Sequence, residues 1–174
     1  MKNKWKMQSN EIFINSVRFI ILVMFQILIL NHINFLGFVN PYIYVLFILL
    51  YPINGNKSLL IFVSFLLGLS IDIFGDSVGI HAAASVFIAF IRPFILKFSF
   101  GVSYEYNMIK INKAPPVAKM VYVIAMVFLH HFVLFVLEIF SLSHIILILK
   151  STLLSGIFSV LLIICTLLLF SRKS

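Results

Sequence analysis

The chain has 174 residues, of which 63% are hydrophobic and only 10% are charged. A water-soluble domain needs far more polar surface, so this composition excludes an ordinary soluble globule and indicates an integral membrane protein. The net charge of +8 would suggest a nucleic-acid partner in a soluble protein. Here the Lys and Arg residues stand at the ends of apolar segments, where they set orientation and meet anionic lipid. We therefore expect membrane lipids as partners, and no nucleic acid.

The first apolar segment is expected to be a signal anchor. It follows a basic start and continues into polar residues without a small-residue cleavage site, so we expect it to stay as the first spanning helix. Cys165 is the only cysteine, which excludes a disulfide within the chain and disfavours a thiolate metal site. We expect no metal and no cofactor.

The remaining segments predict an all-α protein with a single membrane domain over 1–174. The second segment is the shortest, because only ten residues lie between Pro41 and Pro52. At a rise of about 1.5 Å per residue, these cover about half of the hydrocarbon thickness, so a half-helix or a re-entrant hairpin is the alternative. A spanning helix needs about 20 mostly apolar residues, and the six predicted transmembrane helices are 12–30, 35–52, 58–74, 79–98, 117–139 and 144–170.

The distribution of basic residues favours six crossings with both termini inside. This topology places twelve of the thirteen basic residues inside and none in the outer loops, with Lys150 within the last helix. If the second segment did not cross, Lys57 and the basic loop 110–119 would lie outside. The positive-inside rule disfavours that arrangement.

The third and fourth segments predict a tight hairpin at the outer side. Gly75 can adopt the left-handed conformation that ends the third helix, and Asp76 or Ser77 can cap the start of the fourth. Asp72, Asp76 and His81 match no metal motif in their spacing. We expect Asp72 to satisfy nearby backbone or polar groups, because a carboxylate at a helix C-terminus is unfavourable without a partner.

Other ionisable residues lie within the apolar segments. Arg92 is within reach of the inner headgroups, so we expect it to snorkel there. Glu138 and Lys150 lie at similar depths on successive helices, which predicts an ion pair between them. His130 and His131 point about 100° apart, so we expect packed, hydrogen-bonded side chains rather than a joint metal site.

Small residues recur at helical spacing and favour close helix packing. This packing is either within the fold or against a partner helix. We find no nucleophile beside a base, no paired carboxylates on one deep helix face and no phosphate loop, so we do not expect an enzyme. The clearest of these faces, on the last helix, consists of Ser151, Thr152, Ser155, Gly156 and Ser159.

Two stretches in the first half carry a family resemblance. The first is 26–31 with Gly37, Pro41 and Pro52 after it, and the second is 68–74 followed by 79–82. Together they resemble the bacterial rod shape-determining protein MreD family over about the first 95 residues, whereas the second half matches only in hydropathy. The positions that carry the motif are Gln26, Asn31, Gly37, Pro41, Pro52, Gly68, Asp72, Gly79 and His81.

The resemblance implies a non-enzymatic role in cell-wall elongation at the bacterial inner membrane. Members of the family are thought to associate with MreC, a single-span protein, and through it with MreB filaments and peptidoglycan synthases. The MreD fold is also thought to be similar to the substrate-binding subunits of energy-coupling-factor vitamin transporters. The alternative is therefore a subunit that binds a small molecule from outside, for which the polar residues on offer are Asn31, His32, Asn34, Asn40 and the group from Asp72 to His81.

Overall fold

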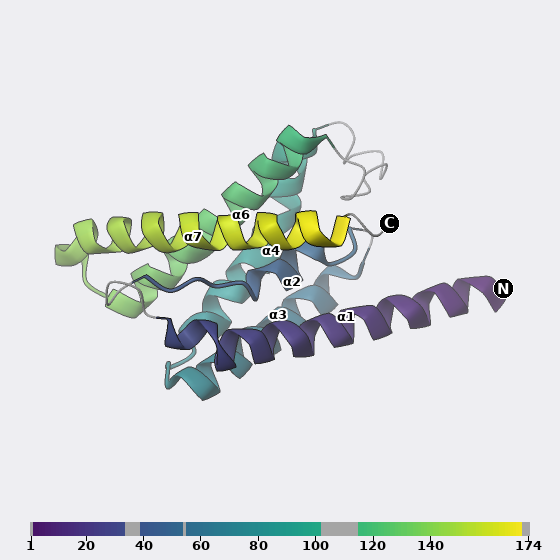
Figure 1. Cartoon of the computed structure of the whole chain (residues 1–174), viewed down its shortest axis with the longest axis horizontal. Coiled ribbons are helices and arrows are strands. Elements are labelled where there is room, and N and C mark those ends of the chain that lie inside the picture. Colours follow the sequence, from purple (N-terminus) through teal and green to yellow (C-terminus); the bar gives the residue numbers. More distant parts are fainter. Residues whose placement is uncertain (1, 34–38, 54, 102–114, 172–174) are drawn as a thin grey trace.

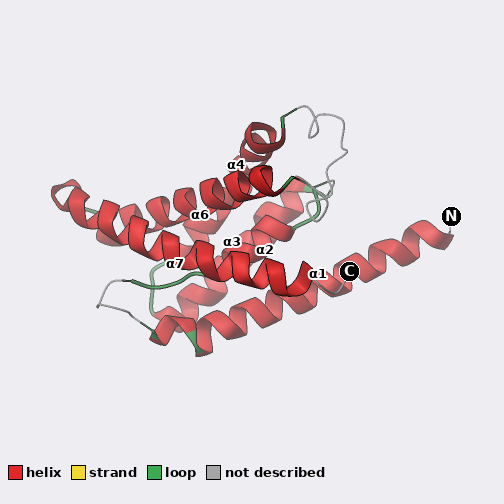
Figure 2. Ribbon diagram, turned by 45° about the horizontal axis from the view of Figure 1, so that its top comes forward, coloured by secondary structure: helices red, strands yellow, loops and turns green. Residues whose placement is uncertain are grey.

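The computed structural model describes residues 2–33, 39–53, 55–101 and 115–171, and the regular elements in this part of the chain are helices (Figure 2). Five of them are long and apolar enough to cross a membrane, as in a multi-pass membrane protein. These are α1 (Lys2–Leu28), α3 (Lys57–Gly75), α4 (Ile80–Phe100), α6 (Pro116–Ile139) and α7 (Ile145–Ser171). Three short helices, η1 (Leu30–His32), α2 (Val45–Leu50) and η3 (Leu142–His144), complete the set.

The long helices form a bundle in which α4 packs against both α3 and α6, and α7 packs against α6. The first residues of α1 and the last residues of α7 lie on the same side of the bundle (Figure 1). α1 and α3 run in the same direction, because a Cβ at Gly75 would lie 3.8 Å from Nδ2 of Asn31 at the end of α1. The end of the bundle at which Asn31 and Gly75 lie is called the pocket end, after the pocket that these residues line. The opposite end, at which Arg92 and Tyr51 lie, is called the Arg92 end.

The sequence predicts a helix through 35–52, but in the described part of this segment, from Val39 on, the helix α2 has only six residues. This corresponds to the half-helix that the sequence leaves open. The segment runs opposite to α1, since Pro41 lies beside Gln26 and Leu50 beside Arg18. The chain thus passes from the pocket end to the Arg92 end as an extended stretch followed by a short helix.

This short helix forms the centre of the core, although it is the smallest α-helix in the described chain. It contacts α1, α4 and α6, and Figure 1 shows it in the middle of the bundle. The side chains of Val45, Phe47, Ile48 and Leu49 are at most 1% exposed. Burial on all sides explains why this segment reads as a continuous apolar run with no polar face.

The turn between α3 and α4 differs from the prediction in its details. The left-handed residue that ends α3 is Asp76, with φ 50°, and Gly75 is the last residue of the helix. No side chain at the N-cap position, Gly79, caps α4. Neither Asp76 nor Ser77 takes this role, because the carboxylate of Asp72 on α3 already accepts hydrogen bonds from the N–H groups of the first turn of α4.

Candidate functional site

The backbone from Val39 to Tyr42, which we call the extended stretch, runs through the interior of the bundle, and a turn at Ile43 and Tyr44 leads from it into α2. The backbone groups of this part of the chain need hydrogen-bond partners. In hydrocarbon, each unsatisfied backbone group costs several kcal/mol, about as much as a lost hydrogen bond in vacuum. Gln26 on α1 is fully buried and satisfies two of these groups. Its Nε2 donates to the carbonyl oxygen of Pro41 (3.1 Å), and its Oε1 accepts from the N–H of Ile43 (2.9 Å). Nε2 also donates to Oδ1 of Asn31 (2.9 Å).

The opposite edge of the same stretch is held by α7. The hydroxyl of Ser155 accepts from the N–H of Asn40 (3.2 Å), and the hydroxyl of Ser159 accepts from the N–H of Tyr42 (2.9 Å). Two helix side chains at a spacing of four therefore match alternate amides of an extended chain. The side chains of α1 and α7 take the place that neighbouring strands have in a sheet.

The small residues of α7 are consequently occupied within the fold. Ser151, Thr152, Ser155 and Ser159 are at most 7% exposed. Gly156 packs against α6, where an added Cβ would lie 2.9 Å from Cε1 of Phe128. This face is an internal contact, and it offers no free surface for a partner helix.

His131 and Ser159 form one consistent hydrogen-bond chain. Nδ1 of His131 lies 2.7 Å from the carbonyl oxygen of Val127, and Nε2 lies 2.9 Å from Oγ of Ser159. A carbonyl only accepts, so in a neutral ring Nδ1 carries the hydrogen and Nε2 accepts from the Ser159 hydroxyl. That hydroxyl can then accept a hydrogen bond from the N–H of Tyr42, so every group in this series of hydrogen bonds is satisfied.

Tyr44 joins two histidines on different helices. Its hydroxyl lies 2.8 Å from Nδ1 of His81 on α4 and 2.9 Å from Nε2 of His130 on α6. A hydroxyl donates one hydrogen bond, so one ring accepts from Tyr44 and the other donates to it. This series of hydrogen bonds ends at Nδ1 of His130, which is buried and has no partner among the described residues. As expected, the two adjacent histidines are packed and hydrogen-bonded separately.

Asp72 supplies the cap of α4 from the neighbouring helix. It is 3% exposed and accepts from the N–H groups of His81 (3.0 Å) and Ala82 (2.8 Å) and from the hydroxyl of Ser77. These amides belong to the first turn of α4, where the helix dipole also favours a negative charge. The expectation that Asp72 satisfies nearby backbone groups is confirmed.

Gly68 allows α3 to approach this first turn closely. A Cβ at this position would overlap the backbone of Ala82 and the carbonyl oxygen of His81. The positions spaced as a motif in the sequence, Gly68, Asp72 and His81, are thus neighbours at the helix crossing. Close backbone contact through glycine is a common way to pack helices in lipid.

Arg92 does not extend toward the headgroups as the sequence predicts. It is 3% exposed and turned into the fold, where its guanidinium donates to Tyr51 O, Leu49 O (3.4 Å) and the Tyr122 hydroxyl (2.9 Å). Both carbonyls belong to the C-terminal end of α2. Because the last carbonyls of a helix have no partner inside it, a buried cation here satisfies them and complements the dipole.

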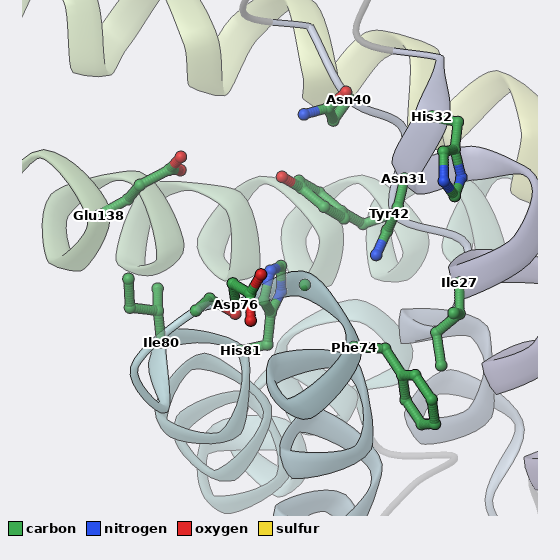
Figure 3. Close-up of a pocket in the computed structure, with 12 residues that line it drawn as sticks. Ile27, Asn31, His32, Asn40, Tyr42, Phe74, Asp76, Ile80, His81 and Glu138 are labelled. Carbon is green, nitrogen blue, oxygen red and sulfur yellow. The ribbon is translucent and has the colours of Figure 1, made fainter.

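A polar pocket of about 380 Å³ opens at the pocket end. Figure 3 shows its lining, which comes from α1 and η1, the extended stretch, the α3–α4 turn and α6. The sequence names several of these residues as candidates for binding a small molecule, but it does not indicate that Tyr42 and Glu138 join them. Asn34 and Gly37 lie outside the described residues. The polar members of the lining are Asn31, His32, Asn40, Tyr42, Asp76, Ser77, His81 and Glu138.

The predicted ion pair between Glu138 and Lys150 stays a prediction. Both side chains are exposed, Glu138 near the end of α6 and Lys150 in the second turn of α7. Glu138 also lines the pocket. No cluster of three or more His, Cys, Asp or Glu residues with metal-binding geometry occurs in the described part of the chain.

Comparison with known proteins adds no relative. No protein-family model, no curated protein and no solved structure matches the chain.

Proposed function

We propose that this chain is a non-enzymatic scaffold of the cell-wall elongation machinery in the bacterial inner membrane. In this role it acts with a single-span partner similar to MreC, and through that partner with MreB-like filaments and peptidoglycan synthases. The proposal rests on the resemblance to the MreD family. In this role the protein maintains rod shape by holding other proteins together, and it catalyses no reaction itself.

One observation supports the proposal most directly: six of the nine residues that carry the resemblance lie together in two adjoining groups. Gln26, Asn31 and Pro41 form one hydrogen-bonded group, and Gly68, Asp72 and His81 form the adjoining helix crossing. A motif that specifies a fold is expected to consist of such mutually dependent packing residues. A catalytic motif would instead place reactive groups around a common reaction centre.

We further propose six crossings, with both termini in the cytoplasm. The extended stretch and α2 together make the second crossing, from the pocket end to the Arg92 end. The charge distribution supports this orientation, because it places the pocket outside and the basic segment ends inside. In a Cys165→Ser background, Lys57→Cys should react only with a membrane-permeant thiol reagent in intact cells, and Ser141→Cys also with an impermeant one. Labelling of Lys57→Cys by the impermeant reagent contradicts the topology.

The functional test is depletion in the native host. Cells should lose their rod shape and become round, and the wild-type gene should restore the shape. An MreC-like single-span protein should co-purify with the tagged chain from native membranes. Rod-shaped cells after full depletion would rule out the scaffold.

The pocket favours a second candidate, the substrate-binding subunit of a small-molecule transporter with a fold similar to that of the energy-coupling-factor subunits. Its polar lining at the outer end is the feature that such a subunit needs. Depletion would then abolish uptake of one nutrient and leave cell shape intact. The two outcomes separate the candidates.

A further inference from the structure

The pocket at the outer end has a one-sided charge. Its lining includes two carboxylates, Asp76 in the α3–α4 turn and Glu138 on α6, and both residues are exposed. Among the described residues that line it there is no Lys and no Arg. This contrasts with the chain as a whole, whose net charge is +8. Two of the five acidic residues of this basic protein thus line one cavity.

The rest of the lining adds hydrogen-bond acceptors and an aromatic surface. The hydroxyl oxygens of Tyr42 and Ser77 can accept hydrogen bonds. The ring of Tyr42 also lines the cavity, and Figure 3 shows its hydroxyl pointing toward the side on which Glu138 lies. The ring is held by an edge contact with His81, at 5.2 Å between centroids, and by a tilted contact with His131 of α6, at 5.3 Å. An aromatic face and carboxylates together are the groups that recognise ammonium ions.

We propose that this pocket binds a small organic cation that carries an ammonium group. The carboxylates of Asp76 and Glu138 supply the charge, Tyr42 supplies an aromatic ring, and the hydroxyls of Tyr42 and Ser77 accept hydrogen bonds from the ligand. A cavity of about 380 Å³ accommodates a metabolite-sized molecule. Anions are disfavoured, because no cationic Lys or Arg side chain among the lining residues would meet them.

The site does not depend on the scaffold proposal, to which it adds a ligand. For the transporter candidate, it names the class of substrate. Its test uses the purified protein, so its outcome is separate from the shape and uptake phenotypes.

The experiment measures the charge preference of the pocket directly. The full chain with Cys165→Ser carries one reporter cysteine, Ile80→Cys, in the pocket lining, or Ser143→Cys, which is exposed outside it. Each variant reacts with trimethylammonium-ethyl and with sulfonatoethyl methanethiosulfonate, and mass spectrometry follows the rates relative to a free small thiol. We expect the ratio of cation rate to anion rate to be on the order of tenfold higher at Ile80→Cys. Phe74→Cys, also in the lining, replaces Ile80→Cys if that variant does not fold.

Two further measurements link the preference to binding. Asp76→Asn with Glu138→Gln should lower the ratio at the pocket reporter to the value at Ser143→Cys. Choline, ethanolamine and putrescine are the probe ligands, and at least one should slow labelling of the pocket reporter, whereas 3,3-dimethyl-1-butanol, the neutral isostere of choline, should not. Equal ratios at the two reporters, a ratio that survives removal of both carboxylates, or no protection by any of the three cations would each overturn the proposal.

Discussion

The carboxylate of Asp72 on α3 accepts a hydrogen bond of 2.8 Å from the backbone N–H of Ala82 on α4. A residue in the last turn of one helix thereby caps the first turn of the next. The cap acts across a helix crossing, so it fixes the angle between two spans as well as the start of one. The adjoining glycine contact at Gly68 brings the two backbones close enough for this bond.

Removing this cap should destabilise the hairpin. We expect Asp72→Ala to lower the free energy of unfolding by about 0.5–2 kcal/mol, the usual cost of losing an N-cap, since two buried amides lose their acceptor. Thermal unfolding in detergent measures the effect. Asp76→Ala is the matched control, because Asp76 is exposed and does not cap α4. Equal losses for the two variants would show that Asp72 is not the cap.

The contact at Gly68 predicts a difference between two glycines. Gly68→Ala should be strongly destabilising, because its Cβ would meet the backbone of α4, which cannot move without shifting the helix. Gly156→Ala should be milder, because its Cβ would meet the ring of Phe128, a side chain that can rotate. The measurement is the melting temperature of each variant in the same detergent. A larger loss for Gly156→Ala would contradict the crossing described for α3 and α4.

The hydroxyl of Ser159 is expected to contribute more to the free energy of unfolding than the hydroxyl of a serine that bonds only within its own helix. Ser159→Ala leaves the N–H of Tyr42 and a ring nitrogen of His131 without a partner, which should cost about 1–3 kcal/mol. Ser70 serves as the control, because its hydroxyl only donates to Leu66 O in its own helix (2.8 Å). Ser70→Ala should therefore change the melting temperature little. Similar melting temperatures for the two variants would refute the bridging role of α7.

Arg92 and the Tyr122 hydroxyl of α6 bond to each other and to the carbonyl oxygen of Leu49 in α2, and a double-mutant cycle can measure the coupling between them. Arg92→Met should lower stability by about 1.5–3 kcal/mol, since a charged donor to buried carbonyls is lost. Tyr122→Phe should cost less, and the double variant should lose less than the sum, with a coupling of about 1 kcal/mol. Arg92→Lys should not restore stability, because one ammonium cannot reproduce the planar fork. Full rescue by lysine would indicate a simple headgroup anchor.

The sequence predicts an ion pair between Glu138 and Lys150, which would compete with a cation bound at Glu138 in the pocket. This pair is the subject of a second cycle, measured without added ligand. Glu138→Gln, Lys150→Met and the double variant are compared by thermal unfolding in detergent. If the two pair, each single variant leaves the other charge uncompensated, so the losses should not add and the coupling should be about 1 kcal/mol. Additive losses would mean that the pair does not form.

The long helices could be predicted from the sequence because their apolar runs are local properties. The segment through α2 could not, since its path depends on side chains far away in the chain. Nothing near Asn40 or Tyr42 indicates that serines of α7 accept their amide hydrogens. Arg92 shows the same difficulty: its depth follows from its position, but the direction of its side chain depends on where the end of α2 lies. The pocket likewise depends on the meeting of four separate elements.

The path of the extended stretch imposes an order on biosynthesis. The amides of Asn40 and Tyr42 find their acceptors 115 and 117 residues later in the chain. Until the ribosome has produced α7, these amides lack the serine acceptors that they have in the folded protein. Unsatisfied amides are costly in hydrocarbon, so the segment is disfavoured there. The stretch therefore reaches its final depth only after the last helix has been inserted. Truncation before Ser155 should leave a protein whose first half is complete in sequence but not integrated in the bilayer, and thus exposed to membrane proteases.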